Sequence, residues 1–188
     1  MWKRILFCSL VMLLGMTGNA WAQEDLKSDP GYVDLSIIEG WFDSEPKIVV
    51  NIKGALLDLV AEASRYEDPE LADLLRKLKS VQVRGFGLRW ADFQDVERRA
   101  SALAQRLESD GWDTVLRVHD DDEQVDVYVR VDDGVIAGMV VVVISPDEDE
   151  SVFVNIVGEI NPEQIGRIGR RFDIDPLDDI HVDYRDNN

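Results

Sequence analysis

Cysteine and histidine are the scarcest of the chemically versatile residues in this chain. The 188 residues contain one cysteine, Cys8, and two histidines, His119 and His181. A single cysteine excludes an internal disulfide framework, and two separate histidines exclude a zinc site built from clustered Cys and His. There is no G-x-S-x-G motif, and both histidines lie in acidic polar stretches typical of a surface. We therefore predict that the protein is not an enzyme and needs no cofactor.

Long hydrophobic runs are also scarce, and the first has the features of a signal peptide. Two basic residues precede an apolar run at 5–16, and the small residues Ala20 and Ala22 follow at the spacing of a cleavage site. We expect residues 1–22 to be removed on export to the periplasm, with an uncleaved anchor as the alternative. The apolar run at 135–144 is about half the roughly 20 residues that a membrane span needs, so it predicts a strand and no span in the mature chain.

Basic residues are in the minority, with 20 Lys and Arg against 38 Asp and Glu. The net charge is −18, and it becomes −20 when residues 1–22 are removed. This acidity excludes nucleic acid and anionic membranes as general partners. Residues 76–106 are an exception, with eight bases and three acids. Either these bases pair with the chain's own acids, or they form a docking face for an envelope protein or an anionic headgroup; the candidate residues are Arg84, Arg89, Trp90, Arg98 and Arg99.

Composition divides the chain after the signal peptide into a polar leader at 23–46, a single domain at 47–172 and an acidic tail at 173–188. The leader contains a few apolar residues that could dock on the domain, namely Ile37, Ile38, Trp41 and Phe42. Runs of β-branched or alternating apolar residues predict strands at 47–52, 81–88, 115–118, 125–131, 135–144 and 152–157. Helical spacing predicts helices at 56–63, 69–78, 93–107 and 162–172. The order predicts an α+β fold, an antiparallel or mixed sheet of about six strands with helices mainly on one face.

Two short segments carry specific local signals. Asp68 followed by Pro69 predicts the start of a helix, because Asp caps free backbone N–H groups and Pro fits the first helical position. Residues 132–134, Asp-Asp-Gly, predict a tight hairpin turn between two strands.

Two segments resemble each other, V-V-N-I-K-G-A-L at 49–56 and F-V-N-I-V-G-E-I at 153–160. One interpretation is that Gly permits a strand-to-helix corner and Asn bonds local backbone in both places. The alternative is pseudo-symmetry, with the two asparagines facing one site. The corner residues are Asn51, Gly54, Asn155 and Gly158.

Acidic turns offer the alternative function of small-ligand or divalent-cation binding. Residues 119–123, H-D-D-D-E, gather carboxylates that could attract calcium. The segment lacks the alternating spacing of a calcium-binding loop, so a solvated hairpin turn is the competing interpretation.

Several motifs together resemble a known bacterial family. They are V-N-I-K-G at 50–54, E-D-P-E-L-A-D-L-L at 67–75, V-Q-V-R-G-F at 81–86, D-G-W at 110–112, V-D-V-Y-V at 125–129 and V-N-I-V-G-E-I at 154–160. They resemble the exported domain-of-unknown-function family numbered 4252, from about residue 47 to residue 172. The resemblance implies an envelope protein of Gram-negative bacteria with no established activity, in a family that tends to accompany extracytoplasmic sigma-factor systems. It supplies no catalytic residues. We therefore expect a non-enzymatic interaction or regulatory module, with a role in envelope stress signalling.

Overall fold

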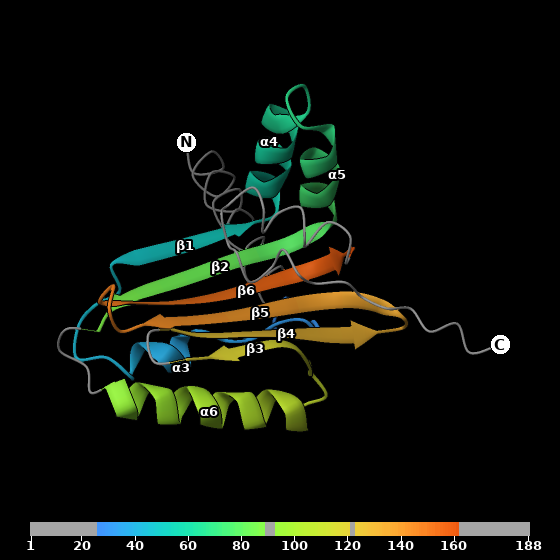
Figure 1. Cartoon of the computed structure of the whole chain (residues 1–188). Coiled ribbons are helices and arrows are strands. Elements are labelled where there is room, and N and C mark those ends of the chain that lie inside the picture. Colours follow the sequence, from blue (N-terminus) through green and yellow to red (C-terminus); the bar gives the residue numbers. More distant parts are fainter. Residues whose placement is uncertain (1–25, 89–92, 121–122, 162–188) are drawn as a thin grey trace, which may run out of the picture.

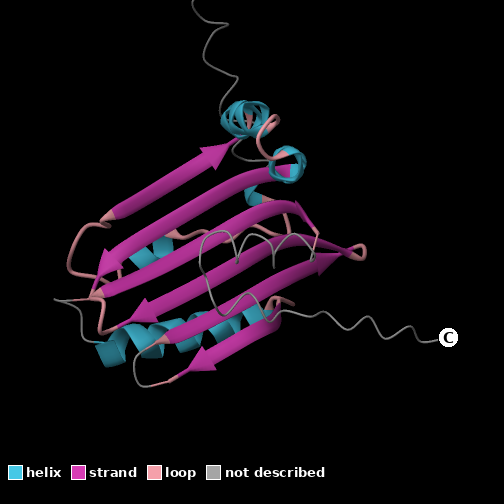
Figure 2. Cartoon of the chain, turned by 45° about the horizontal axis from the view of Figure 1, so that its top comes forward, coloured by secondary structure: helices cyan, strands magenta, loops and turns pink. Residues whose placement is uncertain are grey.

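The computed structural model describes residues 26–88, 93–120 and 123–161. Six strands form one antiparallel sheet in the order β1-β2-β6-β5-β4-β3 (Figures 1 and 2). The strands are β1 (Ile48–Lys53), β2 (Leu78–Gly87), β3 (Asp113–His119), β4 (Gln124–Asp132), β5 (Val135–Ser145) and β6 (Glu150–Ile160). The helices are α3 (Ser36–Glu39), α4 (Ala55–Ser64), α5 (Pro69–Lys77) and α6 (Phe93–Ser109). The predicted α+β class with about six strands is confirmed.

The helices occupy two places. Helices α3 and α6 lie along one face of the sheet, and the α4–α5 hairpin projects from the β1–β2 side (Figure 1). Helix α6 links β2, second in the sheet, to the far edge strand β3, and it runs along the β3–β4 side of this face (Figure 1). None of the helices in the described ranges has the length and apolar character needed to cross a membrane. The helix predicted at 162–172 lies outside the described residues.

Local signals placed several elements correctly. Asp68 is the N-cap of α5, where its Oδ1 accepts a hydrogen bond from Leu71 N at 3.0 Å. The β4–β5 turn places Asp133 and Gly134 at φ 49° and 79°, positive values typical of a tight hairpin. Strand β2 starts at Leu78, three residues before the predicted start. Ser80 and Gln82 are buried on one face of the strand and Val81 lies on the other, which is the alternation of a strand.

The main core lies between the sheet and α6, and the segment predicted as a polar leader is part of it. Leu35, Ile38 and Phe42 are buried among residues of α6 and the inner sheet face. Phe42 stacks on Phe86 with ring centroids 4.1 Å apart, and Phe153 meets both rings edge-on. A short apolar segment ahead of β1 thus completes a core that the domain's own helices leave open.

Residues 29–33 cross the inner face close to the backbone of β5. A Cβ added to Gly31 would lie 2.8 Å from Gly138 Cα, so side chains at both positions are excluded. Asp29, with its side chain 7% exposed, forms an ion pair with Lys79 at 2.5 Å. The crossing therefore depends on two glycines that the sequence reading did not single out.

The opposite face of the sheet is also apolar. Alternation along the strands places a second cluster there, separate from the main core. Its buried members are Val125, Val127, Val129, Met139, Val141 and Ile160. Half-buried aliphatic residues of β2, β3, β5 and β6 extend it. Within the described ranges, every residue of this cluster belongs to a strand.

Candidate functional site

The edge strand β1 exposes apolar side chains on both faces. Val49 is 59% exposed and Ile48 is 40% exposed, and neighbouring residues of a strand point to opposite faces. All six residues pair with β2 from Ile48 to Lys53 without a shift in register. Natural sheets usually protect an edge with a bulge, a proline or charged residues, and β1 has only Lys53 at its end.

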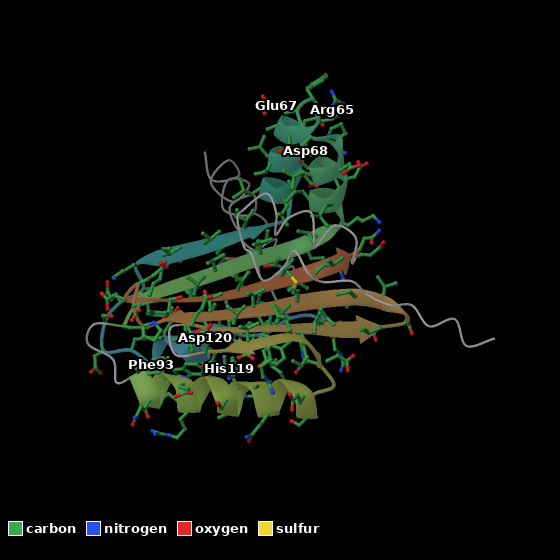
Figure 3. All side chains as sticks on the ribbon, in the orientation of Figure 1. Arg65, Glu67, Asp68, Phe93, His119 and Asp120 are labelled. Carbon is green, nitrogen blue, oxygen red and sulfur yellow. The ribbon has the colours of Figure 1, made fainter. Side chains whose placement is uncertain are left out.

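Helix α4 follows β1 directly and carries a second group of exposed apolar residues. One side of the helix buries Leu57 and Ala61 beside α5. The other side exposes Leu59 by 65%, together with Leu56 and Val60. Figure 3 shows Arg65, Glu67 and Asp68 at the tip of the hairpin, away from the sheet. Helix α4 is therefore apolar on two sides, of which one has no partner within the described ranges.

We call this group the β1–α4 surface. It comprises Ile48, Val49, Leu56, Leu59 and Val60. Scattered exposed apolar residues are normal on any protein, whereas groups of them are typical of an interaction site. Ile48 and Val49 lie at the start of β1, and Leu56, Leu59 and Val60 lie on α4, which follows its other end (Figure 1).

The other edge of the same sheet is built differently. Strand β3 has a register shift between Thr114 and Leu116, which twists an edge and interrupts its pairing. It also carries Asp113, Arg117 and His119 in seven residues. Strand β3 therefore has two of the usual protections against edge pairing, whereas β1 has no register shift and one charged residue, Lys53, at its end.

A polar pocket of about 240 Å³ lies between α6 and the β3–β4 hairpin. Its base is Asp126, which is 3% exposed. Arg117 Nε donates to Asp126 at 2.9 Å, Gln124 Nε2 donates at 2.7 Å, and His119 Nε2 lies 3.2 Å from both carboxylate oxygens. Ser101 lines the same pocket from α6.

The pocket's charges are arranged for mutual pairing. Arg117 also donates to Tyr128 Oη at 3.2 Å, and this hydrogen bond, followed by that to Asp126, raises the pKa of the guanidinium. Burial raises the pKa of Tyr128, while the hydrogen bond from Arg117 opposes the rise. These hydrogen bonds connect β3 to β4 next to α6.

The sequence reading missed this network, because it treated His119 as a residue of an acidic surface turn. Figure 3 shows His119 beside the ribbon of α6. The register of the β3–β4 hairpin would have predicted these contacts. His119 pairs with Gln124, and Arg117 therefore pairs with Asp126. The same register places Tyr128, two residues along β4, on the inner face.

Bases of residues 76–106 form ion pairs with acidic residues of the same chain. Arg84 contacts Glu39 at 3.1 Å and is 14% exposed, and Arg98 and Arg99 both contact Asp95 on their own helix. The remaining pairs are Arg76 with Glu62 and Asp73, Lys77 with Glu159, Lys79 with Asp29, and Arg106 with Asp110. Arg89 and Trp90 lie outside the described residues. These ion pairs agree with the interpretation of internal pairing, and Arg84 lies on β2 whereas Arg98 and Arg99 lie on α6.

The two predicted corners are not equivalent. Gly54, at φ 51°, joins β1 to α4 as predicted, whereas Gly158 lies inside β6, so the prediction of a second corner is wrong. Asn155 is fully buried and bonds Val33 N, Gly31 O and Met139 O, while Asn51 is exposed on β1. Gln82 pairs with Asn51 on one side and Asn155 on the other, so the three side chains lie in one row on the same face of the sheet, where Asn155 is bonded to residues 31 and 33.

Acidic side chains do not gather into a cation site in the described ranges, where no three His, Cys, Asp or Glu residues are placed to hold a metal ion. Two residues of the acidic turn at 119–123 lie outside those ranges.

Comparison with known proteins identifies the family. No curated protein and no solved structure matches the chain. The sequence model of the family described as Domain of unknown function (DUF4252) matches residues 42–168, which include the whole described sheet and every described helix except α3. The chain therefore belongs to the DUF4252 family.

Proposed function

We propose that this protein is a non-enzymatic interaction module of the bacterial envelope that binds a partner protein through the β1–α4 surface. The observation that carries the proposal is the contrast between the two sheet edges. Strand β1 has regular pairing, few charges and exposed apolar residues, whereas β3 has a register shift and three ionisable side chains. An unprotected edge that persists beside a protected one supports a role in binding.

Surface chemistry agrees with a protein partner. Leu59 and Val49, exposed by 65% and 59%, offer apolar area without any charge of their own. Regulation of envelope stress signalling would follow if the partner belongs to a signalling system, which is the role that the family resemblance suggests.

Site-specific photocrosslinking tests the interaction. A photoreactive residue at Leu59 or at Val49 should give discrete adducts with another protein in the cell envelope. The same residue at Val115, which is 39% exposed on β3, serves as the control and should give none. Equal labelling from Val115, or no adduct from either β1–α4 position, would refute the proposal.

Export is tested separately, by fractionating cells and sequencing the amino terminus of the protein. The signal pattern at residues 1–22 predicts a mature chain that begins at Gln23 and is released with the periplasm. An uncut chain in the cytoplasm would contradict it.

A further inference from the structure

We propose that β1 receives an extended segment of the partner as an added strand, and that this segment has acidic residues six positions apart on either side of an apolar stretch. The inference rests on the proposed function, because it specifies the chemistry of the partner at the same surface. Strand addition supplies affinity through main-chain hydrogen bonds and specificity through alternate side chains.

The backbone of β1 suits this mode. Its six residues pair regularly with β2, so the outer edge is a regular row in which alternate N–H and C=O groups point away from the sheet. Val49 and Asn51 lie on one face, and Ile48, Val50 and Ile52 lie on the other. A partner strand with apolar residues at alternate positions would therefore place them beside Ile48, Val50 and Ile52 on one face of the sheet.

The two ends of β1 specify the charge of the partner. Lys47 and Lys53 flank the apolar residues, six positions apart, which is about 20 Å along a strand. Lys53 is exposed and makes no ion pair within the described residues. Lys47 is 63% exposed and contacts Asp149 at 3.8 Å, a long and solvated pair. In a chain of net charge −18, these two lysines attract carboxylates at the same spacing on the partner.

The same charges disfavour a second copy of this chain as the occupant. Antiparallel pairing of residues 47–53 with themselves places each Lys47 opposite the other copy's Lys53. Like charges that face each other across strands are destabilising. The arrangement of lysines therefore selects a different protein over self-association.

Synthetic peptides test the inference with the purified protein. The probe is Glu-Val-Thr-Val-Thr-Val-Glu with a fluorescent label, and the matched control replaces both Glu by Lys. Anisotropy titrations should show the Glu peptide binding about tenfold more tightly than the Lys peptide, as two reversed charge pairs require. In a protein carrying both Lys47→Glu and Lys53→Glu, the preference should invert, because the Lys peptide then supplies the opposite charge.

Backbone recognition is tested with two N-methylated versions of the Glu peptide, one methylated at odd positions and one at even positions. Only alternate amides of an added strand donate to β1, so one version should lose binding and the other should keep it. Equal binding of both versions, or equal binding of the Glu and Lys peptides, would overturn the strand-addition inference.

The two proposals fail in different ways. If Leu59 and Val49 crosslink to another envelope protein while the Glu peptide does not bind, the interaction surface stands and the partner strand is wrong. If both positions crosslink to a second copy of the chain, and sedimentation shows a dimer that Val49→Lys dissociates, then the occupant is the chain itself and the inference is overturned.

Discussion

Asn155 accepts a hydrogen bond from the backbone N–H of Val33 at 3.0 Å, although 122 positions separate the two residues. The side chain is fully buried in β6, and its amide also donates to Gly31 O at 3.0 Å and to Met139 O at 3.3 Å. One asparagine thus joins the segment before the sheet to β6 and β5.

Asn155→Ala should lower the free energy of unfolding by about 2–4 kcal/mol, since three hydrogen bonds are lost and buried backbone groups are left unpaired. Urea unfolding of the purified protein measures the change. Asn51→Ala is the matched control, because Asn51 is exposed on β1 in the same row of the sheet. A similar loss in both variants would mean that the contacts of Asn155 with residues 31–33 are not what stabilises the fold.

Gly138→Ala should destabilise the protein by about 1–3 kcal/mol, because a methyl group there overlaps the backbone of Gly31. The expected consequence is displacement of residues 29–33 from β5, seen as a lower thermal midpoint. Gly40→Ala has no neighbour within 4 Å of the added Cβ and an ordinary φ of −78°, so its midpoint should not fall. An unchanged midpoint for Gly138→Ala would show that the crossing is not close-packed.

Asp126→Ala should cost about 1–3 kcal/mol of stability, because the Gln124 amide and Arg117 both lose a buried acceptor. Asp126→Asn keeps one acceptor oxygen and should fall between the Ala variant and the native protein. Asp132→Ala, at the exposed end of β4, should change stability by less than about 0.5 kcal/mol. The prediction fails if Asp126→Ala and Asp132→Ala unfold at the same urea concentration.

Alkaline pH should destabilise the fold through Tyr128. Burial raises the pKa of Tyr128 in the folded protein, so the folded state holds this proton more tightly than the unfolded chain. The resulting stability is fully present below the ordinary tyrosine pKa of about 10 and is lost as pH rises through the folded pKa. Tyr32, whose pKa is raised chiefly by burial, acts in the same direction.

Urea unfolding at a series of alkaline pH values measures this loss. Tyr128→Phe should be less stable near neutral pH, since Arg117 loses its hydroxyl acceptor, and it should lose less stability above about pH 10. Arg117→Ala should move the tyrosinate absorbance of Tyr128 to still higher pH, because Arg117 lowers that pKa. An identical alkaline loss in native protein and Tyr128→Phe would assign the effect to other groups.

Alternation and capping are local properties, and predictions based on them were confirmed. Val125, Val127 and Val129 alternate with polar residues and form one face of β4. Asp68 caps α5 through a contact with Leu71, three positions along the chain. In each case, the residues that determine the structure are neighbours in the sequence, so the pattern is sufficient.

Predictions that depended on partners across the fold were incomplete. Composition predicts a polar leader at 23–46 whose apolar residues could dock, and only the structure shows that Leu35, Ile38 and Phe42 are buried in the main core. His119 is exposed, as its acidic surroundings predict, and only the structure shows its contact with Asp126 across the β3–β4 hairpin. Gly158 was read as a corner, although β6 continues to Ile160. A residue's own neighbours do not specify what packs against it.

The sequence by itself determined the class of fold, a helix cap, a hairpin turn and the family, because these properties are encoded over a few residues or in matched motifs. It predicts a half-buried strand at 125–131, whereas Asp126 and Tyr128 are buried as well as the valines. Only the tertiary structure decided that β2 pairs with β6, that Asn155 anchors residues 31–33, and that β1 is the less protected edge. Strand order and edge exposure arise from register between segments far apart in the chain, and periodicity indicates which face is apolar without indicating which strand lies beside it.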